Sequence, residues 1–187
     1  MSTLLSESNC QLNDECLRTF LCEVAAIINS RPLTVESLSD VNSLTPLTPN
    51  HLITSKSELI LPPPGNFTSD NMYYRNRWKK VQYLANQFWI RWRTEYLANL
   101  QARTKWNKGR RDISVGDIVI VKDSNLPRCQ WLLAKVVLTC ISQDSHGRSV
   151  GLLIGDSKLD IHGKRVSAVR YLERPVHKLV LLLESDK

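Results

Sequence analysis

Apolar residues recur at three- and four-residue intervals from Leu17 to Ile28, a spacing that places them on one face of an α-helix. Asn13 can cap the first turn of this helix, and the two acids that follow it favour the positive end of the helix dipole. The helix should end near Ser30, because Pro32 disfavours helical geometry at the residue before it and lacks an amide hydrogen. The pattern therefore predicts an amphipathic helix near the N-terminus.

A second apolar stripe with helical spacing runs through a stretch from Tyr73 to about Lys105 that contains neither Pro nor Gly. Its members are Trp78, Val81, Leu84, Phe88, Trp92, Tyr96 and Leu100. At a rise of about 1.5 Å per residue, such a helix would be roughly 45–50 Å long. One long helix is therefore predicted here.

The tryptophans in and after this stretch differ in their expected surroundings. Trp78 and Trp92 lie on the stripe and are expected to pack in a core. Trp89 and Trp106 lie nearer the charged side, where an indole ring can stack on a base. These two are therefore the better candidates for contact with a partner.

Between the two predicted helices, residues 34–72 are rich in Pro, Ser, Thr and Asn and include a run of three prolines followed by Gly65. Such a composition favours extended and turn conformations over regular elements. We interpret this stretch as a connecting arm. Four apolar residues could anchor it on a neighbouring domain, namely Leu44, Leu47, Leu52 and Ile53.

After the second helix, the apolar residues gather in short runs that are separated by turn residues. The runs predict strands at residues 118–121, 131–138, 150–154, 165–169 and 178–183. Short strands at this spacing favour a small closed or nearly closed β-barrel. We therefore expect an α+β protein with four parts, residues 1–33, 34–72, 73–108 and 109–187.

Positive charge is concentrated between Arg75 and Arg111, where eleven Lys and Arg residues stand against one acid, Glu95. This density can neutralise phosphates and release their counterions, which predicts a nucleic-acid partner. The primary candidates for phosphate contact are Arg75, Arg77, Lys79, Lys80, Arg91, Arg93, Lys105, Lys108, Arg110 and Arg111. A solvated helix face is the alternative interpretation of the same charges.

Further basic residues lie in the predicted barrel, where each could also be simply solvated. These secondary candidates are Arg128, Lys135, Arg148, Lys164, Arg165 and Arg174. No segment resembles a recognition helix with Asn, Gln and Arg placed for base edges. Contacts mainly with the phosphate backbone are therefore expected.

The five cysteines and four histidines show no spacing typical of a metal site. Cys16 and Cys140 fall in apolar segments and are expected to be buried thiols. We predict neither a metal nor a cofactor. No apolar run is long enough to cross a bilayer, so an intracellular protein without a membrane partner is expected, nuclear if it acts with DNA.

Six short stretches carry a resemblance to a known family. They are residues 23–34 (EVAAIINSRPLT), 47–52 (LTPNHL), 96–106 (YLANLQARTKW), 115–123 (VGDIVIVKD), Pro127-Arg128 with Trp131, and 174–179 (RPVHKL). In this order the stretches resemble the C-terminal end of the integrase region in BEL/Pao-type retrotransposon polyproteins. They cover most of residues 17–184.

This resemblance implies that residues 1–33 hold the last helix of an RNase H-like catalytic core. It further implies an extended linker and a C-terminal domain similar to the SH3-like β-barrel of retroviral integrases. Catalysis in that family uses three acidic residues that hold two divalent cations. The third acid belongs to a Gly-Gly-x-Trp-Glu-Arg-like stretch upstream of the first matching one.

No such stretch occurs here, and Glu15 and Glu23 fit a solvated helix face. We therefore assign no catalytic residue and expect a protein that is not an enzyme, either a truncated gene product or a fragment of the element. The hypothesis is a nucleic-acid-binding C-terminal fragment of a retrotransposon integrase, which contributes to DNA integration only with the missing catalytic core. Its expected partners are DNA and integrase or polyprotein subunits.

The alternative hypothesis is a protein-interaction module that binds a chromatin or polyprotein partner through the barrel. An aromatic cage for a methylated lysine requires several converging rings. The barrel region offers only Trp131, which is expected in the interior, and Tyr171.

Overall fold

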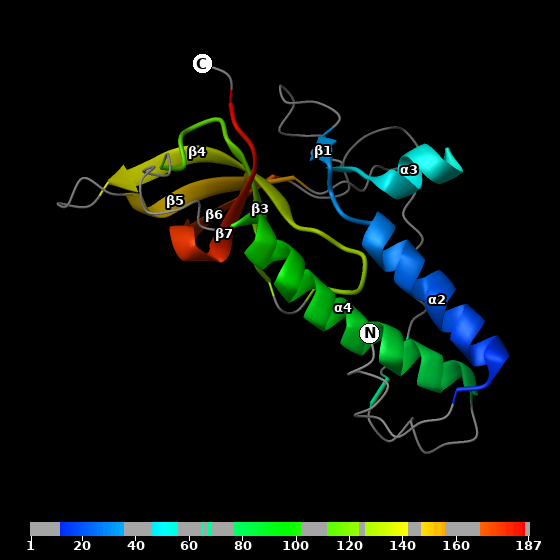
Figure 1. Cartoon of the computed structure of the whole chain (residues 1–187). Helices are drawn as coiled ribbons and strands as arrows, with labels where there is room; N and C mark the ends of the chain where they lie inside the picture. The colour runs from blue at the N-terminus through cyan, green and yellow to red at the C-terminus, as the bar shows by residue number, and fades with distance from the viewer. Residues whose placement is uncertain are drawn as a thin grey trace. The chain divides into compact units, whose positions relative to one another are not determined.

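The structure is a computed structural model of the 187-residue chain (Figure 1). It describes residues 12–35, 46–55, 65, 67–68, 77–101, 112–123, 126–141, 147–155 and 169–185. Helices and an antiparallel sheet are both present, so the predicted α+β class is confirmed.

The chain divides into two compact units, which are considered separately. The helical unit comprises Met1–Arg31, Pro49–Tyr96 and Pro127–Gln130. The sheet unit comprises Pro32–Thr48, Leu97–Leu126 and Trp131–Lys187. Each unit is therefore assembled from stretches that are far apart in the sequence.

The helical unit contains α2 (Asp14–Asn29), α3 (Pro49–Thr54) and most of α4 (Arg77–Leu100). The Asn13 side chain caps α2 by accepting a hydrogen bond from the Cys16 amide at 3.2 Å. Ser30 forms the C-cap of this helix. The predicted N-terminal helix is therefore confirmed at both ends, and the long helix is confirmed over the residues of α4.

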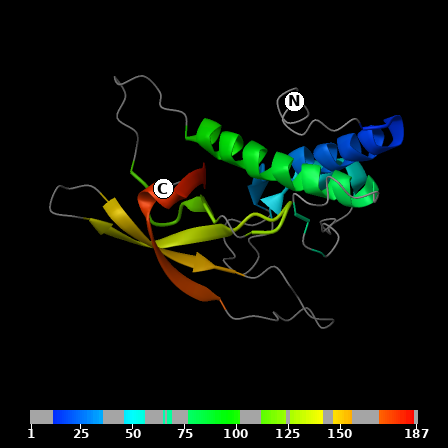
Figure 2. The ribbon, with the colours of Figure 1, turned by 90° about the horizontal axis from the view of Figure 1, so that it is seen from below.

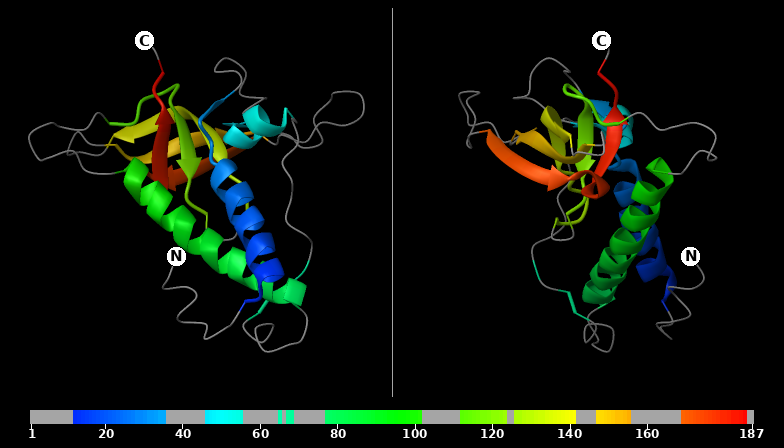
Figure 3. Two further views of the ribbon diagram at one scale, coloured as in Figure 1. Left: turned by 45° about the vertical axis from the view of Figure 1, so that its right-hand side comes forward. Right: turned by 90° about the vertical axis from the view of Figure 1, so that its left-hand side faces the viewer.

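The core of the helical unit lies between α2 and α4, which meet near the first turns of α4 (Figures 1 and 3). Its buried residues are Cys16, Phe20, Val24, Val81 and Leu84. Phe20 is only 2% exposed, as its place on the predicted apolar face requires. Burial of this face, rather than helix propensity alone, stabilises the pair.

The surroundings of two tryptophans are the reverse of those predicted. Trp89 is 3% exposed, whereas Trp78 is 46% exposed. The reason is that α4 buries the row Val81, Ala85 and Trp89, which are spaced four residues apart, and this row turns the charged-side indole inward. Trp92 is half-buried, and Trp106 lies outside the described residues.

The sheet unit is built on five antiparallel strands in the order β6-β5-β4-β3-β7. They are β3 (Ile118–Val121), β4 (Leu133–Ile141), β5 (Gly147–Ile154), β6 (Arg170–Pro175) and β7 (Leu179–Leu183). A one-turn helix, η3 (Val176–Lys178), joins β6 to β7. Figure 2 shows the twist of this sheet, and Figure 3 shows β3 in green between β7 in red and β4 in yellow-green.

One strand of the sheet was not predicted from the sequence. It is β6, which spans Arg170–Pro175, whereas the strand expected at residues 165–169 falls almost wholly outside the described residues and stays a prediction. Charged residues interrupt β6, so its apolar signal is weak. The other predicted runs are confirmed with shifts of up to three residues at their ends.

One face of the sheet carries the core of this unit, whose fully buried members include Val119, Ala134 and Leu152. All four residues of β3 are buried, because this strand is paired on both sides. Within the described residues, β6 and β7 are the edges of the sheet and do not pair with each other. The sheet is therefore open in this part of the chain.

A tight turn before β3 is held by a buried carboxylate. Asp117 is fully buried, and its two oxygens accept hydrogen bonds from the amides of Ser114 at 2.8 Å and Ser185 at 3.0 Å. Gly116 in the same turn has a φ of +98°, which favours glycine. Asp117 thus joins the start of the sheet to its C-terminal end.

The expected arm contains regular elements, contrary to the prediction. The strands β1 (Thr34–Val35) and β2 (Pro46–Leu47) pair in the sheet unit, and α3 lies in the helical unit. Leu52 and Ile53 on α3 are 65% and 70% exposed, so the helical unit does not bury them as anchors. Of the other two expected anchors, Leu47 is half-buried on β2, and Leu44 lies outside the described residues.

Candidate nucleic-acid interface

Helix α4 carries five of the primary candidates, Arg77, Lys79, Lys80, Arg91 and Arg93, and a single acid. Arg77, Lys79 and Arg91 are exposed, and Lys80 and Arg93 are half-buried. The remaining primary candidates, Arg75, Lys105, Lys108, Arg110 and Arg111, lie outside the described residues. About half of the predicted basic segment is therefore placed by the structure.

The cations of α4 form two rows and not one continuous face. At about 100° per residue, Lys80 and Arg91 project within roughly 20° of each other, and Lys79 and Arg93 within roughly 40°. The two rows are roughly 130° apart and border the buried stripe on either side. The cations therefore lie along both borders of the solvent-facing side of α4.

Two of these guanidinium groups contact carboxylates. Arg77 lies 3.8 Å from Glu15, and both side chains are largely exposed. Arg91 donates to Glu95 at 3.0 Å, one helical turn further on. Exposed pairs of this kind contribute about 0–1 kcal/mol, so phosphates can compete with them. The guanidinium carbon of Arg93 lies 5.5 Å from the centre of the Trp89 ring. This contact holds the Arg93 side chain against the surface of the helix.

The sheet unit carries a second group of cations, and only some of them were predicted from the sequence. The elements from β4 to β7 contain five basic residues and one acid, Glu173. The basic residues are Lys135, Arg148, Arg170, Arg174 and Lys178. Arg170 and Lys178 were missed, although both immediately adjoin apolar strand residues. The predicted Lys164 and Arg165 lie outside the described residues.

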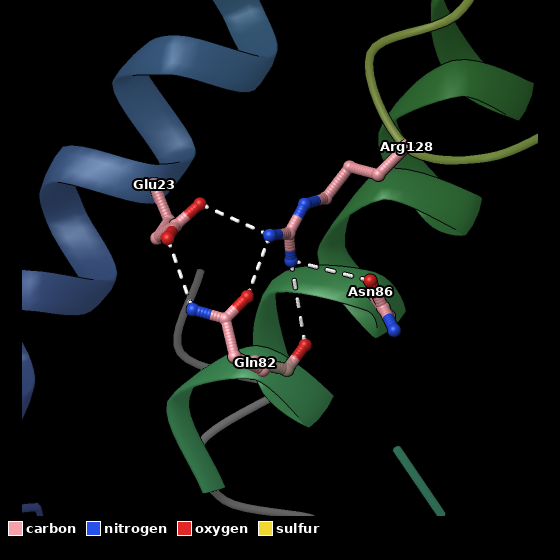
Figure 4. A network of polar contacts seen from close by, with 4 residues as sticks. All are labelled: Glu23, Gln82, Asn86 and Arg128. Carbon is pink, nitrogen blue, oxygen red and sulfur yellow. Dashed lines mark hydrogen bonds and ion pairs between the residues drawn. The ribbon is translucent and has the colours of Figure 1, made fainter. Parts of the chain in front are cut away.

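Arg128 was wrongly predicted to be a surface contact. Its side chain is 2% exposed and forms an ion pair with Glu23 at 3.1 Å (Figure 4). It also donates to the side-chain oxygen of Gln82 at 2.6 Å and to that of Asn86 at 3.2 Å. A guanidinium group with these partners is not available to a phosphate.

Glu23 also differs from its predicted role on a solvated helix face. Its side chain is 27% exposed, and its second oxygen accepts a hydrogen bond from Gln82 at 2.9 Å. Figure 4 shows that the contacts join α2, α4 and the segment that carries Arg128. This buried network holds the helical unit together and is a structural site, not a ligand site. No local pattern in the sequence signals it, because Arg128 is 42, 46 and 105 residues away from Asn86, Gln82 and Glu23.

Next to Arg128, Cys129 is buried, and burial raises the pKa of its thiol. A raised pKa leaves less of the reactive thiolate at neutral pH. We therefore expect iodoacetamide to label the exposed Cys22 at least about tenfold faster than Cys129 in the folded protein, as measured by mass spectrometry of tryptic peptides. In urea the two rates should become equal, whereas similar rates in the folded protein would contradict the burial.

The described residues contain no group of three or more His, Cys, Asp or Glu side chains that could hold a metal ion. No helix among them combines the length and apolar character that crossing a membrane requires.

The fold and these surfaces define an α+β protein with a basic helix and an antiparallel sheet. Residues 76–182 match a protein family described as Family of unknown function (DUF5641), and the chain belongs to this family. The match includes α4, and it includes the strands that carry the second group of cations. No curated protein and no solved structure matches the chain.

Proposed function

We propose that this protein binds nucleic acid through contacts with the phosphate backbone. The observation that carries the proposal is the unbalanced charge of two separate sets of elements. Helix α4 has five basic residues against Glu95, and the elements from β4 to β7 have five against Glu173. Cations at this density attract a polyanion and release its condensed counterions.

We further propose that the protein is the DNA-binding end of a retrotransposon integrase of the BEL/Pao type, with an SH3-like barrel as its C-terminal domain. Strands β3 to β6 follow one another as a meander, and β7 returns to pair with β3 after a single turn of 3₁₀ helix. This strand order supports a small SH3-like barrel. In this proposal the protein contributes binding to integration, and the catalytic acids belong to another part of the element.

The proposal predicts a strong dependence of binding on salt. If about five phosphates are neutralised, the affinity for duplex DNA should fall with salt concentration at a log–log slope near −4 to −5. Replacing Arg77, Lys79 and Lys80 together by Ser should make this slope less steep by roughly 2 to 3. Fluorescence anisotropy titrations of a labelled duplex at several salt concentrations measure both values.

A matched control is available on α2. Arg18 is exposed like Lys79 but belongs to neither group of cations, so Arg18→Ser should leave the slope unchanged while Lys79→Ser reduces it by about 0.9. A slope near zero for the wild-type protein would reject the electrostatic mechanism. Displacement of DNA by polyglutamate at equal charge concentration would instead favour the protein-interaction alternative.

A further inference from the structure

The side of α4 that faces away from the helical core carries a narrow stripe of its own. Its members are Tyr83, Gln87, Ile90 and Thr94, which follow one another at intervals of four, three and four residues. At about 100° per residue they project within roughly 60° of one another, opposite the buried row described above. Ile90 is 55% exposed, so an apolar side chain stands in solvent on this side of the helix. We call these four residues the outer stripe.

The two rows of cations run along the two sides of the outer stripe. The Lys79–Arg93 row lies roughly 70° from the midline of the stripe on one side, and the Lys80–Arg91 row lies roughly 60° from it on the other. The single acid of the helix, Glu95, projects roughly 40° beyond Arg91 and toward the buried row. The solvent-facing side of α4 is therefore positive along both borders, and α4 contributes no acid to it.

A helix with cations on both borders and neutral side chains between them fits the major groove of duplex DNA. An α-helix is about 10–12 Å wide with its side chains, and the major groove of B-form DNA is about 12 Å wide. Phosphates of the two strands line this groove, and base edges form its floor. With the outer stripe toward the floor, each strand has one row of cations beside it.

The outer stripe also presents groups that suit base edges in this groove. The side-chain amide of Gln87 can pair with N6 and N7 of adenine. The hydroxyl of Thr94 donates to the carbonyl oxygen of Ile90 at 2.8 Å, so its methyl group is the part that remains for contact with a ligand. Methyl groups of Ile90 and Thr94 can contact the C5 methyl group of thymine, which lies in the major groove. The stripe therefore favours adenine–thymine pairs.

We propose that α4 enters the major groove of B-form DNA, with the outer stripe on the base edges and one row of cations along each strand. This inference rests on the proposed function and adds to it a form of nucleic acid, a groove and a contact with bases. A single strand has one line of phosphates and would leave one row unused, and the major groove of an RNA duplex is too deep and narrow for side chains to read. Base contacts were not expected from the sequence, because Gln87 is the one residue of the outer stripe with an amide for a base edge.

Glucosylated DNA tests whether the helix enters the groove. In a duplex whose cytosines are replaced by glucosylated 5-hydroxymethylcytosine, sugars fill the major groove while the phosphates stay the same. The wild-type protein should bind this duplex at least about tenfold more weakly than the same sequence with plain cytosine, because even one good base contact is worth that much. Fluorescence anisotropy of the labelled duplexes measures both affinities.

The thymine methyl group tests the assignment to the outer stripe. Two duplexes, one of adenine–thymine and one of adenine–uracil pairs, differ only by this group in the major groove. The wild-type protein should prefer the thymine duplex roughly fourfold, the value of about one buried methyl group. Ile90→Ala combined with Thr94→Ser should remove most of this preference. Leu21→Ala is the matched control, since Leu21 is 44% exposed on α2, and it should keep the preference.

The possible outcomes separate this inference from the proposed function. If glucosylation leaves the affinity unchanged, the helix does not enter the major groove, and the inference is refuted while phosphate binding stands. If the wild-type protein binds no duplex at all, the proposed function itself fails. A thymine preference that is absent from the wild type, or that persists in the double variant, would also refute the assignment to the outer stripe. The glucosylation comparison needs no substitution, so it remains decisive even if a variant folds poorly.

Discussion

Replacing Arg128 by alanine is expected to destabilise the helical unit by about 3 kcal/mol. Removing one partner of a buried ion pair costs about 3–5 kcal/mol, because the other charge stays in a poorly solvated position. The lower end of this range applies because the Glu23 side chain is 27% exposed, so water partly solvates its charge. The variant also leaves Gln82 and Asn86 without the donor that they share. Urea denaturation followed by tryptophan fluorescence measures the change, since Trp89 is buried in this unit.

The chain offers a matched control for burial. Arg91 pairs with Glu95 at 3.0 Å, as Arg128 pairs with Glu23 at 3.1 Å, but the Arg91 side chain is 50% exposed. Arg91→Ala should therefore cost only about 0.3–0.5 kcal/mol, the usual value of an exposed pair one helical turn apart. Equal losses in the two variants would show that Arg128 is not held in a buried network.

In the sheet unit, replacing Asp117 by alanine is expected to cost about 2–4 kcal/mol. The carboxylate is fully buried and accepts hydrogen bonds from the amides of Ser114 and Ser185. Without it, two amide donors lose their partner, and each buried group left unsatisfied costs about 1–3 kcal/mol. Urea denaturation monitored by circular dichroism measures the loss for this unit.

Asp117→Asn provides the sharper comparison. Its side chain keeps one accepting oxygen and replaces the other by an NH₂ group, which cannot accept a hydrogen bond. The variant should therefore lose about half as much stability. Hydrogen exchange should speed up at only one of the two amides, Ser114 or Ser185. Unchanged protection of both amides in Asp117→Ala would contradict the proposed role of the carboxylate.

The helices of this protein could be predicted from local patterns. The cap at Asn13, the apolar spacing after it and the stop before Pro32 each involve neighbouring residues, and α2 follows them closely. The strands were less predictable. The run at residues 118–121 is apolar throughout and was placed correctly, whereas the charges in β6 obscured a strand at the sheet edge. An edge strand needs fewer apolar residues, so its signal is weaker.

The candidate site was predictable as a charge excess but not as a surface. The sequence shows the density of Lys and Arg, but it does not indicate that Arg128 and Arg174 differ in exposure. In the structure Arg128 is buried beside Glu23, and Arg174 is exposed on β6. Which cations can reach a phosphate depends on partners that are distant in the sequence.

The sequence by itself determined the α+β class, the two amphipathic helices, most of the strands and the concentration of positive charge. These properties follow from composition and from periodicities of two or 3.6 residues, which are local. Only the tertiary structure decided that Trp89 is buried, that Arg128 pairs with Glu23, and that β7 returns to β3. Each of these features depends on which distant segments pack together. Complementary packing across the whole unit determines this, and local patterns do not reveal it.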